Sequence, residues 1–223
     1  PHRPFRRQRQ MCIRDSEIVR CRVEDGGILT ERKGINVPRT LVKLPAVGPH
    51  DLDCLDHALS QNVDFVAVSY VRSAADLIPA RERIDAAGVH TWIVAKIEHP
   101  AALDDLTAIV ESADVVMVAR GDLGVEIPLE EVPAAQERIV SACLERGTPV
   151  VVATQMLESM VNHARPTRAE VTDVATAIRQ HVSAVMLSGE TASGQHPVKA
   201  VETMARIAET VEQSTKGLPD PPA

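Results

Sequence analysis

The stretch that decides the fold reads VVMVARGD over residues 115–122, an apolar run that ends on an arginine, a glycine and an acid. Four other apolar runs end in a similar way. Taken together, the polar endings are Ser69, Lys96, Asp122, Thr154 and Ser188, which lie 27, 26, 32 and 34 residues apart. A parallel strand covered on both faces reads as a continuous apolar run, and a helical crossover returns the chain for the next one. The sequence therefore predicts about five parallel βα units.

Polar side chains at the C-terminal ends of successive parallel strands mark the active-site face of a (β/α)8 barrel. A closed barrel needs eight strands and ~250 residues, whereas this chain has 223 residues and five strand endings. The predicted fold class is therefore α/β, an incomplete TIM (β/α)8-type barrel. Short apolar runs flank Asp25-Gly26-Gly27, a hairpin signal that predicts a small antiparallel β unit ahead of the barrel part.

Four segments are predicted along the chain. Residues 1–16 hold five arginines and one acid without an apolar period, and they predict a disordered or non-native lead-in. Residues 17–43 form the β unit, residues 44–215 the partial barrel domain, and residues 216–223 a Pro-rich tail. The helices expected in the barrel part are 50–59, 74–87 with Pro79 shortening or kinking it, 101–110, 130–146, one capped by Thr167 with Glu170, and 198–211.

Composition excludes several classes of function. A net charge of −7 argues against nucleic-acid binding, which needs a basic surface. No apolar stretch approaches the 18 or so residues that span a bilayer, so no membrane partner is expected. The four cysteines are scattered, which favours free thiols in a cytoplasmic protein over zinc or disulfides.

Three side chains at strand ends carry most of the predicted chemistry. Lys96 and Glu98 lie two residues apart, so they leave the same face of the sheet. Asp122 ends the next run, and two carboxylates with room for waters are the usual protein share of a Mg²⁺ site. A lysine beside them can neutralise charge on a phosphoryl group or an enolate oxygen. The alternative is a Lys–Glu ion pair with an aspartate that caps a helix.

Other candidates are weaker when taken singly. Gly121 and Gly124 flank Asp122, where backbone amides can bind an anion or merely form a tight turn. Thr154 and Ser188 can bind substrate, relay a proton or cap a helix. Glu190 can accept a hydrogen bond, orient Lys96 or form a surface pair. Lys33 precedes a glycine in the β unit and can reach a nucleotide phosphate or stay solvated.

Several strings resemble motifs of the pyruvate kinase family, in that family's order. They are KIE at 96–98, MVARGDLGVEIP at 117–128, ATQMLESM at 153–160, RPTRAE at 165–170 and VMLSGETA at 185–192. Residues 33–36 resemble the end of the family's lid domain. The resemblance covers about residues 20–213. It implies a glycolytic phosphotransferase that converts phosphoenolpyruvate and ADP to pyruvate and ATP, with this chain a fragment carrying the lid remnant and barrel strands four to eight.

The resemblance also implies a role for each matched residue. Glu98 and Asp122 would hold the metal, Lys96 would stabilise the moving phosphoryl group, and Lys33 would face the nucleotide. Gly121, Asp122 and Thr154 would bind the substrate carboxylate, with Thr154 near the path that delivers a proton to the enolate. The remaining implied substrate-site residues are Ser188, Glu190, Ser69 and Arg72.

The implied cofactors are Mg²⁺ or Mn²⁺, together with K⁺, whose site is expected outside this sequence. The implied partners are phosphoenolpyruvate and ADP or ATP, and the Arg165–Glu170 loop resembles a subunit contact, hence a homotetramer when the protein is full length. Two other hypotheses stay open. One is a metal-dependent aldolase or lyase that acts on pyruvate enolate, and the other is a truncated, non-catalytic chain.

Overall fold

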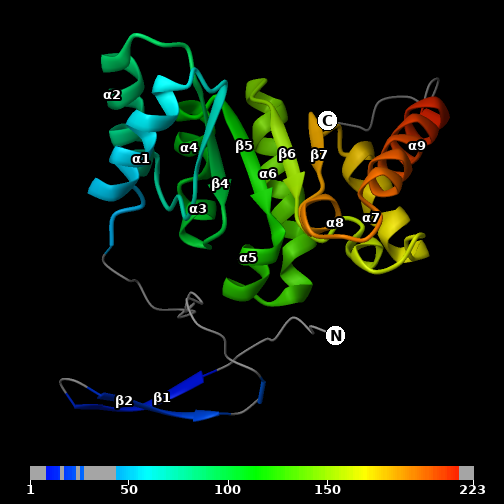
Figure 1. Ribbon diagram of the computed structural model, residues 1–223, viewed down its shortest axis with the longest axis horizontal. Helices are drawn as coiled ribbons and strands as arrows, with labels where there is room; N and C mark the ends of the chain where they lie inside the picture. The colour runs from blue at the N-terminus through cyan, green and yellow to red at the C-terminus, as the bar shows by residue number, and fades with distance from the viewer. Residues whose placement is uncertain (1–8, 16–17, 24–25, 28–43, 216–223) are drawn as a thin grey trace. The chain divides into compact units, whose positions relative to one another are not determined.

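A computed structural model describes residues 9–15, 18–23, 26–27 and 44–215 (Figure 1). They belong to two units that divide between residues 40 and 41. In the first unit, β1 (Arg9–Asp15) pairs antiparallel with β2 (Ile18–Val23), with an irregularity in register between Met11 and Ile13.

The hairpin differs from the one expected. Its second strand β2 pairs with β1, which lies inside the segment predicted as a lead-in. Met11, Cys12 and Ile13 are consecutive apolar residues, and the irregularity between Met11 and Ile13 breaks the period-two alternation that would have predicted a strand. The strand expected at residues 28–30, and Lys33, lie outside the described residues. The boundaries proposed at residues 16 and 43 remain predictions.

The second unit contains a five-stranded parallel sheet whose spatial order follows the chain. Its strands are β3 (Phe65–Val68), β4 (Trp92–Ile97), β5 (Val115–Ala119), β6 (Val150–Ala153) and β7 (Ala184–Met186). Parallel strands in unbroken chain order belong to a barrel, because a doubly wound sheet reverses its order. Among the described residues the sheet is not closed. The predicted incomplete barrel is confirmed.

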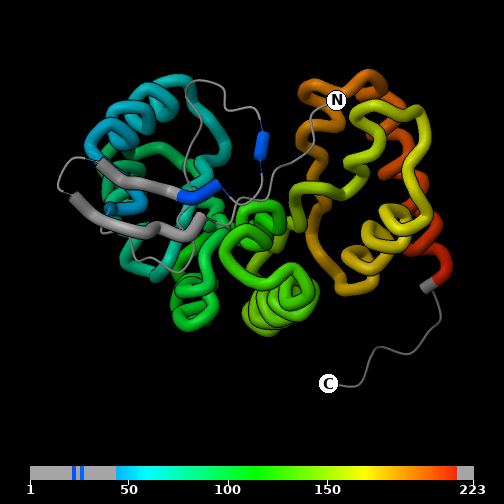
Figure 2. Tube along the Cα trace, turned by 90° about the horizontal axis from the view of Figure 1, so that it is seen from below, coloured from blue at the N-terminus to red at the C-terminus, as the bar shows by residue number. Residues whose placement is uncertain are grey.

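Helices of the second unit follow the strands in chain order, and Figure 2 shows them running from α1 and α2 at one side to α7 and α9 at the other. Their bounds are α1 (Pro49–Ser60), η1 (Ala74–Leu77), α2 (Ile78–Ala87), α3 (Ala101–Asp104), α4 (Leu106–Ser112), α5 (Arg120–Glu126), η2 (Leu129–Glu131), α6 (Val132–Arg146), η3 (Glu158–Val161), α7 (Arg168–Arg179), α8 (Gly189–Ala192) and α9 (Pro197–Thr215). In the part of the chain that the structure describes, no helix is both long and apolar enough to cross a membrane.

Two of the expected helices are interrupted. Pro79 lies in the first turn of α2, where its missing N–H costs nothing, and a short 3-10 turn precedes it. The helix expected over 101–110 breaks at Asp105 into α3 and α4. The Asp105 carboxylate accepts the backbone N–H of Ala74 at 2.9 Å, so a tertiary hydrogen bond accompanies the break.

The core lies on the central strands of the sheet. Val116 and Val118 of β5, and Val150 and Val152 of β6, are fully buried. At the edge, by contrast, Phe65 of β3 is 55% exposed. Burying one valine side chain contributes about 1.5–3 kcal/mol, so the middle of the sheet holds the unit together. It gives the strand ends a rigid base.

The predicted capping box at the start of α7 is present, and it leads to a pH-dependent prediction. Glu170 accepts N–H groups of Thr167 at 2.7 Å and Ser159 at 2.6 Å. Burial opposes ionisation, but these donors and the Ser159 and Thr167 hydroxyls together lower the pKa of Glu170 below its ordinary 4.5. A lowered pKa stabilises the fold above 4.5, and this contribution is lost as pH falls through the folded value.

We therefore expect Glu170→Gln to lower the free energy of unfolding by about 1 kcal/mol at pH 7. The difference from wild type should shrink as pH falls below 4.5 through the lowered pKa of Glu170, because the wild-type side chain then becomes uncharged as well. Urea unfolding followed by circular dichroism at several pH values measures it. Glu137→Gln, on an exposed face of α6, is the control. A difference for Glu170→Gln that stays constant across this range would contradict the prediction.

Candidate active site

The ends of β3 and β4 bring three predicted residues together. Lys96 Nζ lies 2.6 Å from Glu98 Oε1 and donates a hydrogen bond to Ser69 Oγ at 2.8 Å. The Glu98 side chain is 1% exposed, whereas that of Lys96 is 24% exposed. A buried carboxylate is therefore paired with an ammonium group that still reaches solvent. Such a pair can present positive charge at the strand ends.

The second oxygen of Glu98 binds the backbone. Glu98 Oε2 accepts the N–H of Tyr70 at 2.7 Å, and Tyr70 has a φ of +54°, in the region that non-glycine residues rarely adopt. Glu98 thus joins the end of its own strand to the residue that follows Ser69. Each of its oxygens has one donor, and a carboxylate oxygen keeps a further lone pair for a cation.

Asp122 lies in the first turn of α5, directly after β5. Burial raises the pKa of the Tyr70 phenol, and the negative charges of Asp122, Glu98 and Glu126 raise it further, in that order. The carboxylates of Asp122 and Glu98 are therefore both near one phenol. This supports the expectation that the two strand ends converge.

Glu98 and Asp122 are the candidate ligands for a divalent metal. Within the described ranges no group of three or more His, Cys, Asp or Glu side chains is placed to hold an ion. Mg²⁺ commonly takes one or two protein carboxylates and completes its shell with water and substrate oxygens. Glu98 and Asp122 fit that smaller share.

Gly121 and Thr154, both predicted to bind a carboxylate, contact each other. Gly121 N–H donates to Thr154 Oγ1 at 2.7 Å, and that hydroxyl donates to Ala153 O at 2.6 Å. A Cβ at Gly121 would lie 3.2 Å from Thr154 Oγ1, which is tight, so the absence of a side chain permits this approach. The amide and the hydroxyl therefore occupy the same small region.

Glu190 is fully buried. Its Oε1 accepts the N–H of Leu157 at 3.0 Å, and its Oε2 accepts the N–H of Ser188 at 2.8 Å. The surface pair considered for Glu190 is thus wrong, because backbone amides inside the protein satisfy both oxygens. Glu190 ties the loop after β6 to the end of β7.

Arg72 lies in the loop between β3 and η1. Its Nη2 donates to Leu44 O at 2.7 Å and lies 3.6 Å from Asp76 Oδ1. Its backbone N–H also bonds Asp76, at 2.8 Å. These contacts place Arg72 where η1 begins.

Arg120 is a residue that the sequence reasoning missed. Its guanidinium is bonded to Asp173 and to the backbone oxygen of Thr154. The available signal was an arginine at a strand end, directly before the glycine and the acid. Tyr70 was missed as well, because nothing in its sequence position indicates the left-handed backbone.

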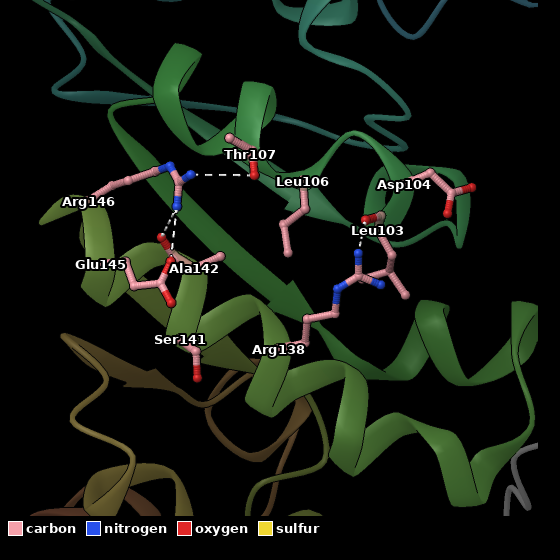
Figure 3. A pocket seen from close by; sticks show the side chains of 9 residues that line it. All are labelled: Leu103, Asp104, Leu106, Thr107, Arg138, Ser141, Ala142, Glu145 and Arg146. Carbon is pink, nitrogen blue, oxygen red and sulfur yellow. Dashed lines mark hydrogen bonds and ion pairs between the residues drawn. The ribbon is translucent and has the colours of Figure 1, made fainter. Parts of the chain in front are cut away.

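A cavity of about 290 Å³ lies outside the sheet, between α3 and α4 on one side and α6 on the other (Figure 3). Arg138 reaches into it and donates to Leu103 O at 2.7 Å, while Arg146 bonds Glu111 at 3.2 Å. The residues that line it include none of the candidates at the strand ends. The chemistry therefore does not coincide with this cavity.

Comparison with known proteins gives a consistent result. The family model for the pyruvate kinase barrel domain matches residues 9–201. Pyruvate kinase of Mycobacterium tuberculosis is 48% identical over 205 residues, and that of Agrobacterium vitis is 50% identical over 205 residues. These alignments cover 92% of this chain but 43% and 42% of the two relatives. Pyruvate kinase of Geobacillus stearothermophilus is 49% identical over 193 residues, which are 86% of this chain and 33% of that relative.

Proposed function

The chain belongs to the pyruvate kinase family, and from that membership we propose that it carries the metal-binding and enolate-binding half of a pyruvate kinase active site. The reaction would be phosphoryl transfer from phosphoenolpyruvate to ADP, giving pyruvate and ATP in glycolysis. The observation that carries the proposal is the 2.6 Å pair of Lys96 with the buried Glu98. The negative charges of Asp122 and Glu98 also both raise the pKa of Tyr70.

In this proposal Glu98 and Asp122 hold Mg²⁺ or Mn²⁺. The metal, when bound, neutralises charge on the phosphate and enolate oxygens. Lys96 adds a second positive group, which Ser69 and Glu98 orient. Phosphoryl transfer depends chiefly on positioning and charge neutralisation. These residues are suited to that work, because they are fixed at rigid strand ends before substrate arrives.

The substrate carboxylate is proposed to bind at Gly121, Asp122 and Thr154. The hydrogen bond between Gly121 N–H and Thr154 Oγ1 would then be exchanged for bonds to the substrate. Exchanging one hydrogen bond for another costs little net free energy. The Thr154 hydroxyl, released from Ala153 O, would have its proton available near the enolate carbon.

The remaining assignments are proposals of the same kind. Ser188 and Glu190 would support the polar end of the site, Arg72 would lie at its border, and Lys33 would face the nucleotide. K⁺ would accompany the divalent metal, and the assembled protein would be a cytoplasmic homotetramer. The lyase alternative has no support from the relatives, which are named pyruvate kinase.

Mn²⁺ binding to the 223-residue chain, followed by electron paramagnetic resonance, tests the metal assignment. We expect Glu98→Gln and Asp122→Asn each to weaken binding at least about tenfold, the loss that even an outer partner of a metal ligand commonly causes. Glu111→Gln, which alters an exposed acid on α4, should leave the affinity unchanged. Equal affinity in all four proteins would overturn the assignment.

A turnover assay with phosphoenolpyruvate and ADP separates the remaining hypotheses. The assay is run on this chain and, where the chain lies within a longer protein, on that protein as well. Turnover that requires Glu98 supports the kinase. Mn²⁺ binding without turnover in either protein would favour the non-catalytic hypothesis.

A further inference from the structure

The turn that follows β6 has an unfavourable backbone. Thr154 has a φ of +71° and Gln155 a φ of +54°, so two successive non-glycine residues adopt the left-handed region. For a β-branched residue such as threonine this is a genuine outlier. Strain of this kind persists only where the surroundings hold it in place. The turn therefore requires a specific restraint.

The guanidinium of Arg120 makes contacts on both sides of this turn. Its Nη2 donates to Thr154 O at 2.8 Å and lies 2.8 Å from Met156 Sδ. Its Nη1 lies 2.7 Å from Asp173 Oδ1 on α7 and 3.4 Å from Gln136 Oε1 on α6. The side chain is 11% exposed. It thus forms a nearly buried link from the turn to two helices.

Arg120 and Gly121 are consecutive, and both bind Thr154. The Arg120 side chain holds the carbonyl oxygen, while the Gly121 N–H holds the hydroxyl at 2.7 Å. Lysine could not replace the first contact, because an ammonium group lacks the planar fork that reaches two acceptors in different directions. The contacts restrain both the backbone and the side chain of Thr154.

We propose that Arg120 is a positioning residue that holds the strained Thr154 turn, so that the threonine hydroxyl stays against the Gly121 amide. The substrate role of that amide and hydroxyl rests on the proposed function, but the positioning itself concerns only the protein. Asp173, at 37% exposure, keeps the guanidinium in its place.

The competing explanation is an ordinary ion pair. A pair that includes a partly exposed carboxylate contributes little to stability, and its removal would lower stability slightly without altering the turn. The two explanations differ in their effect on one atom, the amide hydrogen of Gly121. If Arg120 holds the turn, losing it loosens the Gly121–Thr154 hydrogen bond.

Amide hydrogen exchange measured by NMR on the full chain is therefore the test. We expect the Gly121 amide to exchange about tenfold faster in Arg120→Met than in wild type, after correction for global stability. Arg120→Lys should restore much of the stability, because it can still pair with Asp173, yet it should leave Gly121 in fast exchange. This split between stability and exchange would not arise from a merely structural role.

Arg81→Met is the matched control. Arg81 Nη2 lies 2.6 Å from Asp114 Oδ2, beside the starts of β4 and β5, so the variant removes a comparable pair from the opposite ends of those strands. Its Gly121 exchange should match wild type. Should Arg120→Met fail to fold, Arg120→Lys carries the same comparison.

Unchanged Gly121 exchange in the Arg120 variants would overturn the proposal. Mn²⁺ binding is measured on the same samples. A wild-type chain that binds no Mn²⁺ would count against the proposed function, while the exchange comparison would still decide the role of Arg120.

Discussion

Replacing Lys96 by methionine in the longer kinase proposed above is expected to reduce phosphoryl transfer by about a hundredfold to a thousandfold, because it removes a positive group placed where charge develops. Mn²⁺ binding should survive, since the carboxylates of Glu98 and Asp122 remain. Turnover is measured as pyruvate formation, and metal binding is measured separately by electron paramagnetic resonance. Losing transfer while keeping the metal would assign the lysine to the reaction rather than to the metal site.

The same variant has a second, structural effect. Lys96 is the cation paired with Glu98, whose side chain is 1% exposed. Methionine removes that cation and leaves the carboxylate bonded to the Tyr70 N–H. Leaving a buried polar group underpaired costs roughly 1–3 kcal/mol. Bound Mn²⁺ should offset part of this loss. The melting temperature of the variant should therefore rise more with Mn²⁺ than that of wild type.

Lys199→Met, which alters an exposed lysine of α9, is the control for Lys96. It should leave both turnover and the Mn²⁺ response unchanged. Retained turnover in the Lys96 variant would reject the role given to this residue, whatever its effect on stability.

Replacing Glu190 by leucine is expected to cost about 3 kcal/mol of unfolding free energy, since one buried and one partly buried N–H group lose their acceptor and each loss costs roughly 1–3 kcal/mol. The N–H groups belong to Leu157 and Ser188. For a chain of this size the expected fall in melting temperature is about 10 °C. Differential scanning calorimetry and urea unfolding measure both quantities.

The Glu190→Gln variant keeps the size of the side chain but loses one of its two acceptor oxygens, so it separates the effect of packing from that of hydrogen bonding. Glutamine keeps one acceptor oxygen, so it should lose about half as much stability as leucine does. Glu202→Leu, on an exposed face of α9, should change stability by less than about 0.5 kcal/mol. Equal, small losses in all three variants would show that the buried carboxylate is not needed by the loops it joins.

The part of the fold that the sequence predicts is the parallel sheet. Central strands such as Val115–Ala119 are covered on both faces, so they appear as apolar runs whatever the rest of the chain does. The pairing of Lys96 with Glu98 followed from the alternation of side chains along a strand. The cap at Thr167 was readable because its partner Glu170 lies three residues away.

Other features depend on partners far along the chain. The partners of Glu190 both precede it in the sequence, at very different separations: Leu157 is 33 residues away and Ser188 two. The guanidinium of Arg120 reaches Asp173, which is 53 residues away. No local pattern encodes such contacts. The break at Asp105 has the same origin, because its carboxylate binds the amide of Ala74 across 31 residues.

Within the described part of the chain, no strand pairs with the outer sides of β3 and β7, which has a consequence for how the sheet meets other polypeptides. Each presents a row of backbone donors and acceptors, and such a row recruits any extended segment that can run beside it. A neighbour that also covered the exposed ring of Phe65 would gain a hydrophobic contact there. A segment that completes the sheet and an unrelated segment that merely adheres to it would therefore compete for the same strand edges. Binding of one would exclude the other.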